Sequence, residues 1–197
     1  MQPGFSFGTE WYDEDMQYTF NELELPNGGR LGLGCCPGHR LRLSPLGLVH
    51  MTERVRDDLK LIAAWKPHAV LSLMEEDELH GAGAPVHLLA EELQAHGVDW
   101  LHLPIVDMCA PDHRFETAWV DVWPRLHREL EQGGRVFVHC YAGLGRTGTI
   151  AALILMKYGV SARDAILQVR AARPGSVQSF EQESYLTRAM RAPLVDR

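Results

Sequence analysis

Residues 135–158 read RVFVHCYAGLGRTGTIAALILMKY, and the strongest structural pattern of the chain lies in this stretch. It opens with a short, mostly apolar run over 135–140, which is typical of a strand. From Arg146 to Tyr158 the residues are apolar nearly all round a helix, which indicates a buried central helix. The glycine-containing segment between the two therefore joins a strand directly to the amino end of a helix.

A loop that enters a helix in this way is suited to bind an anion. Successive backbone N–H groups converge there and the helix dipole adds positive potential. Gly143, Gly145 and Gly148 permit the unusual backbone dihedrals that such a loop needs. The whole chain carries 19 Lys and Arg against 26 Asp and Glu, a net charge of -7, so an anion site must be built locally.

Cys140 lies at the base of this loop, where the same amides and dipole stabilise a thiolate. We therefore expect a nucleophile that is ionised without a dedicated base. Arg146 can reach back over the loop and hold two phosphate oxygens through its planar fork, as a lysine could not do equally well. Thr147 can donate its hydroxyl to the sulfur when the thiolate leaves. An inert buried thiol is the plain alternative for Cys140, disfavoured by the coincidence of cysteine, glycines and arginine.

Two other phosphate-binding patterns fit less well. The nucleotide-binding pattern G-x-x-x-x-G-K-[ST] is met by Gly143 and Gly148, but Thr149 stands where the lysine is required. The dinucleotide pattern G-x-G-x-x-G is met by the three loop glycines, with Asp164 at a tolerable distance for a ribose contact. That interpretation is weak because a second helix follows instead of a strand, and because it leaves the cysteine and the arginine unexplained.

The rest of the chain alternates between strand and helix patterns. Strands are predicted over 31–36, 69–74, 98–103 and 135–140. Helices are predicted over 52–65, 86–96, 115–132 and 146–158, and Pro124 should kink or split the third. Two more helices open with capping boxes, Ser161 with Asp164 and Ser179 with Gln182. The alternation predicts an α/β fold with a central, mostly parallel sheet of about four to five strands and helices on both faces.

The length and composition favour one soluble domain. We assign residues 31–190 to the domain, 1–30 to an N-terminal extension packed on or flanking it, and 191–197 to a C-terminal tail. No apolar run approaches the roughly 18 residues of a membrane span, and the first residues do not resemble a secretory signal. We therefore expect a cytoplasmic protein with no membrane or nucleic-acid partner.

The four cysteines, Cys35, Cys36, Cys109 and Cys140, are too few for a disulfide scaffold in a chain of this size. The segment CCPGH over 35–39 lacks a second pair of ligands at zinc-finger spacing. We expect no bound metal.

Residues 139–147 fit the pattern H-C-x5-R-[ST], and on it the chain resembles the cysteine-dependent protein tyrosine and dual-specificity phosphatases. From about residue 31 to 190 it is similar to the dual-specificity subgroup that contains the kinase-associated phosphatase (cyclin-dependent kinase inhibitor 3). The similar segments are LGLG with Pro37-Gly38, PIVD over 104–107 with Pro111-Asp112, and Val177-Gln178 with Gln182 and Tyr185-Leu186. The resemblance implies a protein tyrosine phosphatase-like fold, a phosphocysteine intermediate and no cofactor.

The resemblance also implies roles for single residues. Asp107 would be the general acid on a mobile loop. Gln182, or else Gln178, would line the site and position water. The phosphate loop would consist of Tyr141, Ala142, Gly143, Leu144, Gly145 and Arg146.

Several of these residues have plainer interpretations. Asp112 directly precedes a predicted helix, which is the position of an N-terminal cap. Gln182 could serve only to complete the capping box with Ser179, and His139 is expected to be structural. Arg40 and Arg42 could contact an acidic or phosphorylated partner, although solvated surface arginines are the simpler interpretation.

The expected substrate is a phosphorylated protein carrying phosphotyrosine, with phosphoserine and phosphothreonine as further substrates. Phosphoinositide phosphatases of this superfamily commonly place lysines within the loop, whereas residues 141–145 are all uncharged. A phosphoinositide or another small phosphate ester stays open as an alternative, as does a phosphate-binding pseudophosphatase. The sequence identifies no partner protein.

Overall fold

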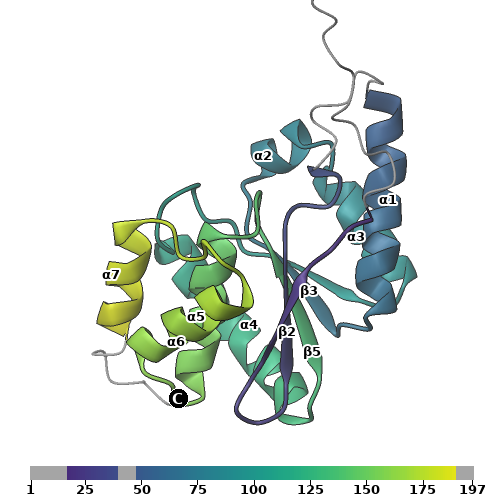
Figure 1. Cartoon of the computed structure of the whole chain (residues 1–197). Helices are drawn as coiled ribbons and strands as arrows, with labels where there is room; N and C mark the ends of the chain where they lie inside the picture. Colours follow the sequence, from purple (N-terminus) through teal and green to yellow (C-terminus); the bar gives the residue numbers. More distant parts are fainter. Residues whose placement is uncertain (1–16, 40–47, 190–197) are drawn as a thin grey trace, which may run out of the picture.

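The structure is a computed structural model in which residues 17–39 and 48–189 are described. Five strands form one sheet in the order β1-β2-β5-β3-β4 (Figure 1). β2 (Arg30–Gly34), β5 (Arg135–His139), β3 (Ala69–Ser72) and β4 (Asp99–His102) are parallel, and β1 (Asn21–Glu24) pairs antiparallel with β2. The predicted α/β class and all four predicted strands are confirmed, and each strand ends one or two residues earlier than its pattern indicated.

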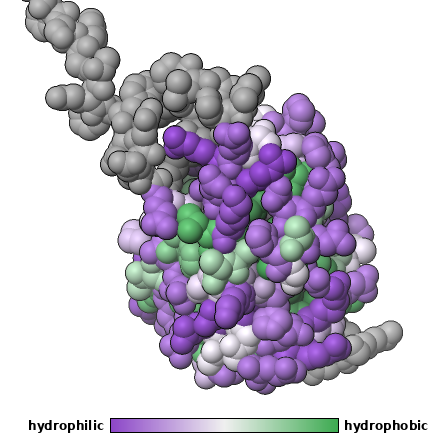
Figure 2. All heavy atoms as spheres, turned by 90° about the vertical axis from the view of Figure 1, so that its right-hand side faces the viewer, coloured by the Kyte–Doolittle hydropathy of each residue, from purple (hydrophilic) through white to green (hydrophobic). Residues whose placement is uncertain are grey.

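Helices cover both faces of this sheet, as the alternating pattern predicted. Figure 1 shows α1 and α3 against one face and α4, α5, α6 and α7 on the other. Their bounds are Leu48–Ala64 (α1), Glu76–Gly81 (α2), Val86–Ala95 (α3), His113–Glu131 (α4), Gly145–Lys157 (α5), Ala162–Ala172 (α6) and Phe180–Ala189 (α7). Figure 2 looks onto the side of α1 and α3, where polar residues cover most of the described surface. Over residues 17–39 and 48–189, no helix combines the length and the apolar character that crossing a membrane requires.

The core lies between the central strands and α5. β3 is buried at all four positions and β5 at four of five, as expected of parallel strands that are covered on both faces. The glycines of β2 make room for Phe137 on the neighbouring strand, because an added Cβ would lie 2.6 Å from its ring at Gly32 and 2.5 Å at Gly34. The sequence LGLG is therefore explained by packing within the sheet.

α4 runs through Pro124 as one helix and is not split. Proline removes one backbone donor, but the buried residues Phe115 and Trp119 before it and Leu126 and Leu130 after it share one face. Packing of that face against the sheet keeps the two halves together.

Two elements were not predicted. β1 lies in the segment that we assigned to an N-terminal extension, and only one of its four residues, Leu23, is buried. α2 has six residues and one buried side chain, Leu79. Neither is long enough to show a hydrophobic period. The tail 191–197, Arg40 and Arg42 lie outside the described residues.

Candidate active site

The segment from Cys140 to Leu144 turns from the end of β5 into α5, which begins at Gly145. Gly143 has a φ of 73°, and a side chain there would collide with the backbone of Gly34 and Cys35. Only glycine fits this position without strain. Cys140 is 3% exposed and Arg146 is 1% exposed, whereas Tyr141, Ala142 and Leu144 between them are partly exposed. The segment thus forms a cradle at the carboxyl ends of the parallel strands, with the cysteine and the arginine buried in it.

The carbonyl groups of the loop are held from outside. The Cys36 N–H donates to the Tyr141 carbonyl at 3.0 Å. Arg173 donates from Nε to the Gly143 carbonyl at 2.6 Å and from Nη2 to the Ala142 carbonyl at 3.0 Å. Because the carbonyls are engaged on this side and the first N–H groups of a helix have no partner within it, the loop amides are available to an anion. Arg173 was not predicted from the sequence, and no local pattern there singles it out.

We expect Arg173→Lys to weaken oxyanion binding about tenfold, which corresponds to about 1.4 kcal/mol. A lysine ammonium cannot reproduce the planar fork that reaches both loop carbonyls and also Asn21 Oδ1 at 2.7 Å. Inhibition by vanadate and kcat/KM would both be measured. Arg135→Lys is the matched control, because Arg135 also donates to a backbone carbonyl, that of Trp65, but at the opposite end of β5. Equal losses in both variants would show a general effect on stability.

Arg146 is held by a carboxylate that the sequence did not reveal. Its Nη1 lies 2.6 Å from Glu78 Oε2 and its Nη2 lies 3.0 Å from Glu78 Oε1, so α2 grips the guanidinium with both oxygens. Nη1 also donates to the Ile105 carbonyl at 3.0 Å. Burial opposes ionisation of Glu78, but the hydrogen bonds from Arg146 and from the Glu75 N–H hold its pKa below the ordinary value. The guanidinium of Arg146 is therefore oriented before any phosphate binds.

The two candidate acids have different surroundings. Asp107 Oδ1 lies 2.9 Å from Arg146 Nη2 and its side chain is 64% exposed, so this residue reaches the loop from a solvent-facing position. Asp112 instead accepts hydrogen bonds from the N–H groups of Arg114 and Phe115, which confirms the predicted N-terminal cap of α4. The Arg114 side chain, together with these N–H groups, lowers the pKa of Asp112.

Asp112→Ala is expected to lower the free energy of unfolding by about 1 kcal/mol through loss of the cap. Because the folded-state pKa of Asp112 is depressed, its charge stabilises the fold above the ordinary carboxyl pKa, and this contribution is lost as the pH falls through the folded-state pKa. Urea unfolding at neutral and acidic pH would measure both effects, with Asp121→Asn, a change at an exposed residue of α4, as the control. An unchanged unfolding midpoint in Asp112→Ala at neutral pH would contradict the capping role.

The two predicted glutamines lie over the first residue of α5. A Cβ at Gly145 would come within 2.9 Å of Gln178 Oε1 and 3.1 Å of Gln182 Nε2. Gln182 Oε1 accepts from the Ser179 N–H, and the Ser179 hydroxyl accepts from the Gln182 N–H, so the predicted capping box is present. Gln182 Nε2 also donates to the Cys109 carbonyl at 3.2 Å, which ties α7 to the loop of Asp107. The Gln182 side chain can therefore complete the cap of α7 and also line the site.

His139 is buried and neutral. Burial first, and then the neighbouring His102 and the charge of Arg146, lower its pKa to about 4 against a hydrogen bond with the Cys140 backbone. Its Nε2 lies 2.6 Å from the Ser72 hydroxyl, which in turn accepts from Trp100 Nε1 at 2.8 Å. These contacts anchor the end of β5 to β3 and β4, in keeping with the predicted structural role.

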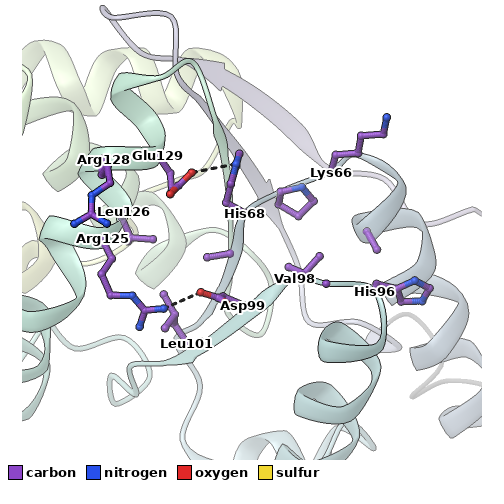
Figure 3. Close-up of a pocket in the computed structure, with 14 residues that line it drawn as sticks. Lys66, His68, His96, Val98, Asp99, Leu101, Arg125, Leu126, Arg128 and Glu129 are labelled. Carbon is purple, nitrogen blue, oxygen red and sulfur yellow. Dashed lines mark hydrogen bonds and ion pairs between the residues drawn. The ribbon is translucent and has the colours of Figure 1, made fainter.

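Two hollows differ in their chemistry. A space of about 320 Å³ beside the loop is lined by Asp77, Glu78, Gly81, Asp107 and Tyr141. A larger one of about 650 Å³ lies at the amino ends of β3 and β4, where His68 Nε2 lies 3.1 Å from Glu129 Oε2 and an ion pair joins Arg125 to Asp99 at 2.7 Å (Figure 3). The candidate site is the smaller hollow, because two of its lining residues, Glu78 and Asp107, contact Arg146.

Comparisons with known proteins agree with this geometry. Residues 42–186 match the family model described as "Swiss Army Knife protein, DSP-PTPase phosphatase domain". A protein tyrosine phosphatase type IVA 2 from Mus musculus is 32% identical over 114 residues, which cover 58% of this chain and 64% of that relative. The chain thus spans less than two thirds of the length of this relative.

Solved structures show the same fold. Kinase-associated phosphatase, in a form with its catalytic cysteine replaced by serine, aligns with a TM-score of 0.73 at 23% identity, covering 91% of this chain and 99% of that one. The active form of Tk-PTP aligns with a TM-score of 0.61 at 29% identity, covering 83% and 92%. With the family model matching most of its length, the chain belongs to the cysteine-dependent dual-specificity and protein tyrosine phosphatase domain family.

Proposed function

We propose that this protein is a phosphoprotein phosphatase that hydrolyses phosphotyrosine, with phosphoserine and phosphothreonine as further substrates, through a phosphocysteine intermediate. The observation that carries the proposal is the convergence of three residues on one cradle. Cys140 forms its buried floor, Arg146 lies within it, and Asp107 lies 2.9 Å from Arg146. Membership of the phosphatase family supports the same reaction.

In the first half of the reaction the Cys140 thiolate attacks phosphorus in line with the ester oxygen. A sulfur–phosphorus bond forms, the phosphorus–oxygen bond breaks, and Asp107 gives its proton to the leaving oxygen. The loop amides and Arg146 hold the equatorial oxygens. Positioning and charge stabilisation of this kind are the main contributions available in phosphoryl transfer.

In the second half water attacks the phosphocysteine. Asp107, now ionised, takes a proton from the water, and the sulfur leaves as a thiolate with inorganic phosphate as the product. Gln182 and Gln178 are proposed to position the water. Thr147 is fully buried, and its hydroxyl has no hydrogen-bond partner among the residues that the structure describes, so it is available to donate to the departing sulfur.

The contacts of Arg146 are suited to a site in which the substrate phosphate replaces a carboxylate. Glu78 is less exposed than Asp107 and holds the guanidinium with two oxygens, so it can keep the fork in place throughout. Asp107 makes a single exposed contact with Arg146. We propose that the phosphate displaces this contact and frees Asp107 for proton transfer.

Hydrolysis of a generic aryl phosphate in the presence of a metal chelator tests the proposal. We expect turnover that persists in chelator and is blocked by vanadate. Binding of vanadate without turnover would indicate a pseudophosphatase. We also propose a cytoplasmic location, supported by the four cysteines, none of which forms a disulfide within residues 17–39 and 48–189.

A further inference from the structure

The entrance of the candidate site carries a charge opposite to that of its floor. Of the five described residues that line the hollow, Asp77, Glu78 and Asp107 are acidic and none is basic. Below them lies one cation, Arg146, which pairs with both Glu78 and Asp107. Three carboxylates against one guanidinium give this region a formal charge of two negative units before any phosphate enters.

Asp77 differs from the other two lining carboxylates, which both pair with Arg146. Its side chain is exposed, and it forms no ion pair within residues 17–39 and 48–189. The nearby Glu75 differs, because Arg114 Nη2 lies 2.9 Å from its Oε1. Asp77 therefore offers a free negative charge on the α2 side of the hollow.

Buried donors beneath the entrance independently indicate that an anion binds there. Arg146 is 1% exposed, yet its Nε has no hydrogen-bond partner in the described part of the chain. The buried Thr147 hydroxyl is likewise without one. Buried donors are normally satisfied, so these groups point to a ligand that supplies acceptors to this cradle. An anion must then pass carboxylates to reach its site.

We propose that the preferred substrate is a phosphopeptide with a lysine or arginine beside the phosphorylated residue, and that this basic side chain lies against Asp77. The inference rests on the proposed function and names the substrate class of the same site. The phosphate satisfies the loop and Arg146, while the neighbouring cation offsets the charge that the acidic entrance adds. Electrostatic complementarity of this kind gives specificity and faster association.

The same arrangement disfavours esters with several negative groups. A phosphoinositide headgroup or a doubly phosphorylated peptide brings at least one more anion into a hollow whose described lining residues are all acidic or uncharged. Like charges at close quarters repel each other, and none of the described lining residues is a cation that could hold the second phosphate.

The test compares kcat/KM for phosphotyrosine peptides of one sequence with lysine, glutamine or glutamate on either side of the phosphotyrosine, and for a soluble short-chain phosphoinositide. We expect the lysine peptide to exceed the glutamate peptide about fivefold at low salt, the range for an exposed ion pair, with a smaller ratio at high salt. The phosphoinositide should be poorer than every peptide.

Substitutions of Asp77 test whether this residue causes the preference for lysine. Asp77→Asn should remove most of the preference for lysine, and Asp77→Lys should reverse it. The preference is taken as the ratio of kcat/KM for the lysine and glutamate peptides, so that a general change in rate on all phosphate esters cancels. Asp121→Asn removes an exposed carboxylate from α4 and should keep the wild-type preference. A thermal melt of each variant checks folding.

The outcomes separate this inference from the proposed function. If the aryl phosphate is hydrolysed but the three peptides react equally, or if Asp77→Lys keeps the wild-type order, the acidic entrance does not select the substrate. A preference for the phosphoinositide would also overturn the inference. If wild-type protein hydrolyses none of these esters, the proposed function itself is wrong.

Discussion

Cys140→Ser is expected to lower turnover of every phosphate ester by about 10⁴ to 10⁶-fold, the scale seen when a nucleophile is removed, and to leave oxyanion binding in place. A serine hydroxyl is a much weaker nucleophile than a cysteine sulfur, so the attacking group is lost. The binding groups are untouched, because the loop carbonyls are still held by Arg173 and the Arg146 fork by Glu78. Vanadate binding by the variant should therefore stay within a few-fold of wild type.

The measurement pairs aryl phosphate hydrolysis with a vanadate titration followed by calorimetry. Cys109→Ser is the matched control, since the contact of Cys109 with Gln182 uses its backbone carbonyl and not its thiol. Hydrolysis by Cys140→Ser at a hundredth of the wild-type rate or more would show that another group attacks phosphorus. Loss of both turnover and vanadate binding would instead indicate a collapsed loop.

The site residues that lie close together in the sequence could be predicted from it. The loop glycines and Cys140, Arg146 and Thr147 lie between a strand and a helix whose apolar patterns are strong, and the structure places them there. Gly143 shows why the pattern is so restrictive, since any side chain would strike the backbone of Gly34 and Cys35. The cap at Asp112 was predictable for the same reason, because capping depends on neighbours in sequence.

The supporting residues could not be predicted because their contacts are distant in sequence. Glu78 meets Arg146 across 68 positions, and Arg173 meets the carbonyls of Ala142 and Gly143 across about thirty. Glu78 also belongs to a helix of six residues, which is too short to show a period. A glutamate in an acidic run is usually solvated, so only the fold reveals that this one orients the phosphate-binding arginine.

The assignment of the general acid leads to the second large effect. Asp107 and Asp112 lie in the same connection between β4 and α4, and either could donate a proton by chemistry alone. Asp107 contacts Arg146 at 2.9 Å, whereas Asp112 is occupied by the first turn of α4 and by Arg114. Because the Arg114 side chain and the backbone N–H groups lower the pKa of Asp112, it is a poor proton donor.

Asp107→Ala should therefore lower kcat by about 10² to 10⁴-fold for an ester with a poor leaving group, such as an alkyl or phenyl phosphate. The loss should be much smaller for a nitrophenyl phosphate, whose leaving oxygen needs no proton. Asp112→Ala should change neither rate by more than a few-fold, because its main effect is to lower the free energy of unfolding. The two variants and the two esters form one experiment. A large loss of hydrolysis is expected only when Asp107→Ala acts on the ester with the poor leaving group. If that leaving-group-dependent loss appears in Asp112→Ala and not in Asp107→Ala, the cap must open during catalysis and Asp112 is the acid.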